Sequence, residues 1–157
     1  MGYASLGAVG PVSLEIEVEG LEETAERFEG ASEDLAYFVE TELAQVGDAE
    51  VVPFAQSIAP VKIGYYRDSI YARTEPWKLI LGAHAPHSRF IEYGTRPHLI
   101  VPFRASVLHF FIDGEEVFAR YVFHPGTLPL FVLHEALAWK RFEILDAVER
   151  GIQAALG

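Results

Sequence analysis

Apolar and polar residues alternate strictly near the start of the chain. Within residues 11–19, every second position is apolar and the positions between are Ser or Glu; the apolar residues are Val12, Leu14, Ile16 and Val18. A period of two places all four on one face of a strand whose other face is polar. The pattern therefore predicts a half-buried strand over residues 11–19, which ends at Gly20.

A helical period follows over residues 21–58. Apolar residues recur there at intervals of three and four, as in Leu35, Phe38, Val39, Leu43 and Val46. This spacing is typical of an amphipathic helix that buries one stripe. Glycine weakens a helix, so we expect a break near Gly47-Asp48 and a second helical piece that ends before Pro60.

A second long helix is predicted from Pro129 to about Ala155. Its apolar residues also follow the helical period. The face that we expect it to bury consists of Phe131, Leu133, Leu137, Phe142, Leu145, Val148, Ile152 and Leu156.

The chain between the two helices has the pattern of a sheet. Residues 67–74 and 77–82 read as a strand pair with Glu75-Pro76 at the bend, and the second strand as buried on both faces. A short helix over residues 86–93 and an extended run over residues 98–103 follow. Asp113-Gly114 lies between two strand-like runs, residues 107–112 and 115–123, and this dipeptide is a strong signal for a hairpin.

This order of elements predicts an α+β fold. We expect an antiparallel sheet with a β-hairpin, packed against a long N-terminal helix, broken in the middle, and a C-terminal helix. A chain of 157 residues fits one domain over residues 1–157, with residues 1–10 as a flexible N-terminal segment.

The charge of the chain limits its partners. The formal net charge is −11, from 23 acidic and 12 basic residues. Proteins that grip nucleic acid by its phosphates need a basic stripe, so we expect only weak binding to DNA. No apolar run approaches the roughly 20 residues of a membrane span, so no membrane partner is expected. The chain has no cysteine, which excludes disulfides.

Candidate chemistry is sparse. Among six histidines, His84 and His87 are three residues apart, and His124 and His134 lie near the last helix. Zinc sites need three or four ligands at characteristic spacings, and no His-Glu-x-x-His segment is present. No serine occupies a Gly-x-Ser-x-Gly elbow, and no glycine-rich phosphate loop is present. We therefore predict no catalytic residue, no metal and no cofactor.

Two turns have a clear structural interpretation. Glu92 precedes Gly94-Thr95 and is expected to stabilise that turn as a hydrogen-bond acceptor, paired with Arg89 or Arg96. In His124-Pro125-Gly126-Thr127, proline fixes its own φ, glycine permits a positive φ and threonine can cap the following helix. Pro129 then fits the first turn of that helix.

Aromatic residues are concentrated around the predicted hairpin: Phe110, Phe111, Phe118, Tyr121 and Phe123. On alternating positions, some of them must face away from the core. We expect another subunit to cover them; the alternative is a two-layer core that uses both faces of the hairpin.

Three segments, in this order, carry a resemblance to a known family. They are Ala59-Pro60-Val61-Lys62-Ile63-Gly64-Tyr65-Tyr66-Arg67-Asp68-Ser69-Ile70, Arg89-Phe90-Ile91-Glu92-Tyr93-Gly94-Thr95 and His124-Pro125-Gly126-Thr127. Together they resemble the gene-product-ten-like tail-component family of tailed phages, over roughly residues 21–155. The chain departs from the family pattern at Ile63, where Thr is frequent, and at Tyr66, where Leu is frequent.

The resemblance implies a structural protein of the virion neck, in a tail-completion role. Family members join the head connector to the tail as rings, expected to be six-fold, with DNA passing through the lumen. The partners would be further copies of the chain, the head connector and the tail tube or terminator. The protein would reside in the virion, and in the host cytoplasm during assembly. The implied contact residues are Glu92, Tyr93, Gly94, Thr95, Phe111, Asp113, Gly114, His124, Pro125, Gly126 and Thr127.

The sequence leaves three other functions open. The first alternative is a tail terminator that caps the growing tube. The second is a small hydrolase or metal-dependent enzyme that uses His84, His87 or His124. The third is a toxin–antitoxin-like or nucleic-acid-binding module, which the acidic charge disfavours.

Overall fold

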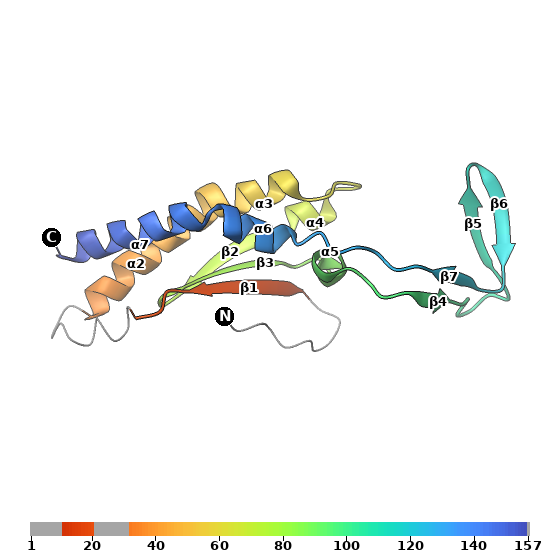
Figure 1. Ribbon diagram of the computed structural model, residues 1–157, viewed down its shortest axis with the longest axis horizontal. Helices are drawn as coiled ribbons and strands as arrows, with labels where there is room; N and C mark the ends of the chain where they lie inside the picture. Colours follow the sequence, from red (N-terminus) through yellow and green to blue (C-terminus); the bar gives the residue numbers. More distant parts are fainter. Residues whose placement is uncertain (1–10, 21–31, 157) are drawn as a thin grey trace.

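The computed structural model describes residues 11–20 and 32–156. The predicted flexible segment, residues 1–10, and the predicted start of the first helix, residues 21–31, lie outside the described residues. The described part consists of a body, in which helices lie on a sheet, and an arm that extends from one end of it (Figure 1).

The sheet of the body has three antiparallel strands. They are β1 (Val12–Glu17), β2 (Ile70–Glu75) and β3 (Lys78–Ala83), in the order β1-β3-β2. The predicted first strand and the pairing of the next two are thus confirmed, with Glu75 opposite Lys78 across the turn. The predicted start of the pair at residue 67 is wrong, because residues 65–68 form a helical turn and the strand begins at Ile70. The prediction that the second strand of the pair is buried on both faces is also confirmed, because Leu79, Ile80 and Leu81 of the central β3 are all buried.

The first helix continues where a break was expected. α2 (Ser32–Val46) runs through a π-helical turn, η1 (Gly47–Val51), into α3 (Val52–Ile58). The Val52 N–H donates to the Gly47 carbonyl oxygen, which is the wider π spacing. A Cβ on Gly47 would lie only 3.0 Å from side-chain atoms of Ala72 and Leu79, so glycine lets this turn lie close against the sheet. The end of the helix before Pro60 is confirmed.

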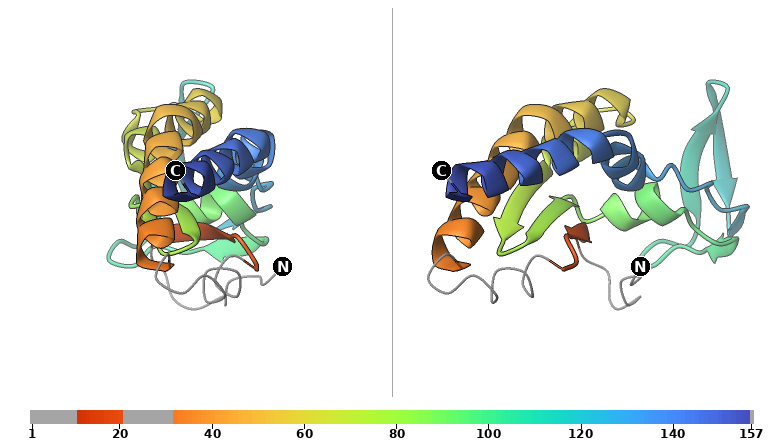
Figure 2. Two further views of the ribbon diagram at one scale, coloured as in Figure 1. Left: turned by 90° about the vertical axis from the view of Figure 1, so that its left-hand side faces the viewer. Right: turned by 60° about the vertical axis from the view of Figure 1, so that its left-hand side comes forward.

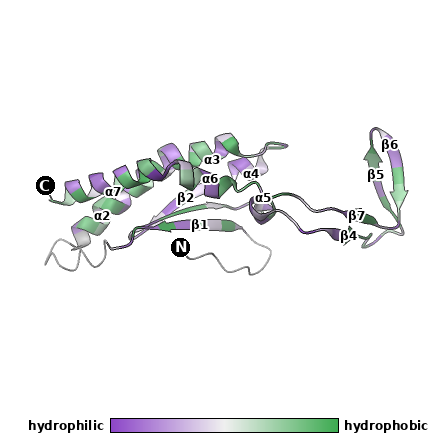
Figure 3. Cartoon of the chain, viewed as in Figure 1, coloured by the Kyte–Doolittle hydropathy of each residue, from purple (hydrophilic) through white to green (hydrophobic). Residues whose placement is uncertain are grey.

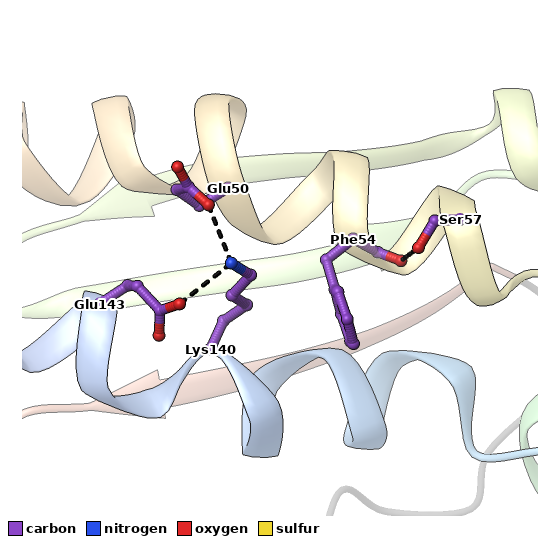
Figure 4. Close-up of polar contacts among 5 residues, drawn as sticks. All are labelled: Glu50, Phe54, Ser57, Lys140 and Glu143. Carbon is purple, nitrogen blue, oxygen red and sulfur yellow. Dashed lines mark hydrogen bonds and ion pairs between the residues drawn. The ribbon is translucent and has the colours of Figure 1, made fainter.

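The predicted single C-terminal helix is wrong in its start and in its continuity. α6 (Val132–Trp139) and α7 (Arg141–Leu156) are separate helices that meet at Lys140. The Lys140 Nζ atom bonds Glu50 of the π turn at 2.8 Å and Glu143 of α7 at 3.0 Å, and lies over the ring of Phe54 (Figure 4). The hydrogen bonds to Glu50 and then to Glu143 raise the pKa of Lys140. The bend is therefore tied to the first helix.

The bend changes which side of the last helix is buried. Leu133, Leu137 and Val148 are buried as predicted. Four other predicted core residues are 41–70% exposed: Phe131, Phe142, Leu145 and Leu156. The buried face of α7 is instead formed by Ile144, Ala147, Val148 and Gly151, because α7 begins in a different phase from α6.

The core lies between the helices and one face of the sheet (Figure 2). Its fully buried large side chains are Val39, Leu43, Val51, Leu79, Leu81, Leu133 and Ile144. Two short helices, α4 (Tyr65–Asp68) and α5 (Ser88–Tyr93), lie at the end of the body from which the arm leaves. The predicted α+β fold is confirmed. Among the described residues, no helix has the length and apolar character needed to cross a membrane.

The arm consists of two strand pairs. β4 (His98–Ile100) pairs with β7 (Val122–His124), and beyond them β5 (Leu108–Ile112) forms a hairpin with β6 (Glu115–Ala119). The predicted hairpin turn is confirmed, because Asp113 and Gly114 both have positive φ, 52° and 89°. The predicted strand over residues 115–123 is divided between β6 and β7.

The hairpin stands away from the helices, at the far end of the arm (Figure 1). Phe111, Phe118 and Phe123 are 61–65% exposed, so the single chain does not form the alternative two-layer core around them. Colouring by hydropathy marks β5 and β7 as apolar (Figure 3).

Candidate functional site at the base of the arm

The two Gly-Thr turns, which are far apart in the sequence, meet at the base of the arm. The Thr95 N–H donates to the Thr127 carbonyl oxygen at 3.0 Å, and the Thr127 N–H donates to the Thr95 carbonyl oxygen at 3.2 Å. The two hydroxyl oxygens lie 3.1 Å apart, and the Thr127 N–H also reaches the Thr95 Oγ1 atom at 3.0 Å. This threonine bridge clamps the two strands where they leave the body.

A glycine precedes each threonine of the bridge and makes the close approach possible. Gly94 has φ of 69° and Gly126 has φ of 89°, so the positive φ predicted for Gly126 is confirmed. A Cβ on Gly94 would collide with the Thr127 carbonyl oxygen, and a Cβ on Gly126 would collide with the Thr95 carbonyl oxygen. Each glycine therefore leaves space for the backbone of the opposite strand.

Glu92 connects the base of the arm to the body. Its side chain is fully buried at the end of α5. The carboxylate accepts the backbone N–H of Leu133 at 3.0 Å and that of His134 at 3.1 Å, and its Oε1 atom lies 2.6 Å from His134 Nδ1. The first N–H groups of a helix have no partner within the helix, so Glu92 caps α6 from another element.

This geometry corrects three details predicted from the sequence. Glu92 is an acceptor as expected, but its partners are the start of α6 and His134, not Arg89 or Arg96. Thr127 does not cap the following helix, because α6 begins only at Val132. For the same reason, Pro129 lies before the helix and not in its first turn.

Two tyrosines surround the buried carboxylate. Tyr66 is buried, and within the described part of the chain its hydroxyl has no hydrogen-bond partner. Burial raises the pKa of Tyr66 well above its ordinary value, and the Glu92 carboxylate raises it further. Burial and then Glu92 also raise the pKa of Tyr93, whose ring meets the His134 ring edge-on at 5.9 Å. Glu92 thus lies in an apolar, aromatic setting.

A pair of histidines forms the first cross-strand pair of the arm. His98 and His124 are cross-strand neighbours with stacked rings, 5.0 Å between centroids. His124 Nδ1 accepts the Gly126 N–H at 3.0 Å, so a neutral His124 has its proton on Nε2. His98 Nδ1 lies 2.9 Å from the Arg96 carbonyl oxygen, to which it donates. Pro125, which is exposed, lies between His124 and Gly126 in the chain.

An open groove of about 360 Å³ lies where the arm meets the body. We call it the junction groove; most of its lining comes from α5 and from the residues on either side of the threonine bridge, namely His87, Phe90, Ile91, Thr95, His98, His124, Thr127, Leu128 and Leu130. The exposed lining atoms are almost entirely apolar. This groove therefore has the character of a contact surface more than of a polar reaction site.

The structure thus brings together eight of the predicted contact residues and separates three. Glu92, Tyr93, Gly94 and Thr95 meet the segment His124-Pro125-Gly126-Thr127, whereas Phe111, Asp113 and Gly114 lie at the hairpin (Figure 1). Sequence reasoning missed the neighbours Tyr66, His98 and His134. A signal existed for Tyr66, which replaces the Leu frequent in the family that the chain resembles.

The histidines considered for an enzyme have other neighbours. His84 stacks on Tyr71 with centroids 4.1 Å apart, and His87 lies beside Tyr65 at 5.9 Å. Within residues 11–20 and 32–156, no group of three or more His, Cys, Asp or Glu side chains is placed to hold a metal ion.

Comparison of the chain with protein-family models, with curated proteins and with solved structures finds no match. The function proposed below therefore rests on the motifs in the sequence and on the geometry of the arm.

Proposed function

We propose that this chain is a structural protein of a phage neck, which joins the head connector to the tail as part of a ring through which DNA passes. The observation that carries the proposal is the threonine bridge. Two of the three segments that resemble the tail-component family, Glu92-Tyr93-Gly94-Thr95 and His124-Pro125-Gly126-Thr127, pair with each other and hold out the arm.

The exposed side chains of the arm support an assembly role. Phe103, Phe111, Phe118 and Phe123 are all more than 60% exposed. Large groups of exposed apolar side chains mark surfaces that other proteins cover. An arm that ends in such side chains suits a subunit that reaches over its neighbours.

The acidic charge supports a passive relation to DNA. A net charge of −11 repels the phosphate backbone, so a ring of such subunits would let DNA pass without adhering. The proposal includes no catalytic residue, metal or cofactor. The buried Glu92 has a structural role in it, as the cap of α6.

The direct test is to delete the gene from the phage or prophage that encodes it and to image the particles by electron microscopy. We expect heads filled with DNA and finished tails that are not joined to each other, and a plasmid copy of the gene should restore joined particles. Tails of uncontrolled length would instead identify the tail-terminator alternative. Normal joined particles would show that neither role is correct.

A further inference from the structure

We propose that the hairpin of one copy of this chain docks in the junction groove of the next copy, in a head-to-tail contact. This inference rests on the ring in the proposed function and names the contact that would build it. The occupant of the groove is a second copy of the chain, presenting β5 and β6.

The first observation is that the chain carries two uncovered apolar surfaces. On one face of the hairpin, Phe111 and Phe118 are 61–63% exposed, and the ring of His109 lies against both. At the junction groove, Phe90, Leu128 and Leu130 are 41–85% exposed. On each surface the exposed apolar side chains are grouped, so we expect another molecule to cover each surface.

The second observation is that the two surfaces cannot meet within one chain. The threonine bridge and the β4–β7 pair hold the two strands of the arm together and extended. The hairpin therefore stands at the opposite end of the arm from α5 (Figures 1 and 2), and α5 contributes to the lining of the groove. Only another molecule can bring a hairpin to the groove.

The third observation is that charged residues of opposite sign flank the two surfaces. The hairpin, residues 108–119, contains Asp113, Glu115 and Glu116 and no Lys or Arg, and its net charge stays negative when the next residue, Arg120, is included. The described residues that line the groove include no Asp or Glu, and Arg89 and Arg96 are the chain neighbours of its lining residues Phe90 and Thr95. The acidic residue of this region, Glu92, is buried and bonded to α6.

The charges also decide between two ways of pairing the copies. A symmetric contact between two hairpins would place three carboxylates against three carboxylates, which is unfavourable. A contact between hairpin and groove places acidic groups near basic ones. Because its two halves differ, such a contact is heterologous, and repeated contacts of this kind close into a ring when the rotation between copies allows it.

The test uses two variants that each lose one surface. Phe111→Asp places a charge on the hairpin and Leu128→Asp places one in the groove; both residues are exposed, so the folded monomer should persist, as melting temperature and circular dichroism would verify. Native mass spectrometry of the wild-type chain should show a closed assembly larger than a dimer. Each variant alone should be monomeric.

The decisive sample is an equimolar mixture of the two variants. The Leu128→Asp copy has an intact hairpin and the Phe111→Asp copy has an intact groove, so one good contact forms and the mixture should give a dimer and nothing larger. Tyr37→Asp, which changes an exposed aromatic residue on α2, is the matched control and should assemble like the wild type.

Three results would overturn the proposal. A wild-type chain that stays monomeric at millimolar concentration would show that a second copy is not the occupant. Folded variants that assemble alone, or that give no dimer when mixed although the wild type assembles, would show that these two surfaces do not pair. The neck function is tested separately by the unjoined heads and tails, so it can stand when this contact fails.

Discussion

At the scale of single residues, Glu92 links two helices through several hydrogen bonds. One buried carboxylate accepts two backbone N–H groups of α6 and contacts the ring of His134. The carboxylate therefore links α5, at the base of the arm, to the first turn of a core helix.

Replacing Glu92 with Gln tests this role. The amide keeps the shape of the side chain, but it replaces one accepting oxygen with a donor that would face a backbone N–H. We expect the free energy of unfolding to fall by about 1–3 kcal/mol, the usual result of leaving a buried polar group without a partner. Chemical denaturation measures it. Glu15→Gln on the exposed face of β1 is the control and should have little effect; equal losses in both variants would contradict the capping role.

Tyr66 offers a prediction of the opposite sign. Its buried hydroxyl lacks a hydrogen-bond partner among the described residues, so Tyr66→Phe removes a desolvated group and keeps the ring. We expect the free energy of unfolding to rise by about 1–3 kcal/mol. A loss of stability in this variant would mean that the hydroxyl has a partner after all.

The same residue predicts how stability depends on pH. The pKa of Tyr66 is raised above its ordinary value of 10.0 in the folded chain. Below pH 10 both states keep the proton, and above it the unfolded chain releases the proton first, so stability falls as pH rises. Tyr66→Phe should reduce this alkaline loss, which melting temperatures between pH 9 and about pH 11 would measure. Part of the loss should remain, because the pKa of Tyr93 is raised as well.

Gly126 is the residue on which the threonine bridge depends. Gly126→Val would force a β-branched side chain to a φ of 89° and drive its Cβ into the Thr95 carbonyl oxygen. We expect a cost of about 1–3 kcal/mol, concentrated at the base of the arm. Hydrogen exchange should show faster exchange of the Thr95 and Thr127 amides. Gly20→Val, also at positive φ but with no atom of the described residues within 4 Å of the added Cβ, separates backbone strain from the collision.

At the scale of elements, α2 and α7 pack closely against each other in the body. A Cβ on Gly151 would lie 2.6 Å from the Val39 Cα atom, so these helices approach at a glycine. Gly151→Ala would improve helix propensity by about 1 kcal/mol if nothing else changed.

We expect Gly151→Ala to destabilise the protein instead, by about 1–3 kcal/mol, because the added methyl group separates the helices. The control is Ala154→Gly at an exposed position of α7, which should lose stability through helix propensity alone. The sign of the change at Gly151, read from thermal unfolding, is the result that matters: a gain would contradict the close contact.

The elements also show what a sequence can predict. The strands of the body and the Asp113-Gly114 turn follow from local alternation and turn chemistry, and these predictions are confirmed. The bend at Lys140 depends on Glu50, ninety residues away, and the π turn depends on the fit of Gly47 to the sheet. A period in the sequence contains no information about such distant partners.

The candidate site was likewise predictable only in its local features. The positive φ of Gly126 was predictable from a single tetrapeptide. The pairing of Thr95 with Thr127 and the capping of α6 by Glu92 join residues more than thirty positions apart. Chemistry at each position suggested turns and an acceptor, but only the folded chain identifies the partners.

At the scale of the whole molecule, the acidic charge predicts weak binding to duplex DNA. We expect low affinity at physiological salt and little change of affinity with salt concentration, since no basic cluster is available to neutralise several phosphates. Titration of labelled duplex at two salt concentrations measures both quantities. Tight binding that weakens steeply with salt would contradict a passive lumen.

The threonine bridge has a consequence for how such a subunit can vary. Both strands of the arm leave the body at the threonine bridge, so the chain between Thr95 and Thr127 leaves the body and returns to it at the same point. Among the described residues, the strands of this segment pair only with one another. Insertions or deletions there alter how far a subunit reaches without passing through the core. Because none of the described core residues lies in this segment, such changes of reach leave the residues of the core in place.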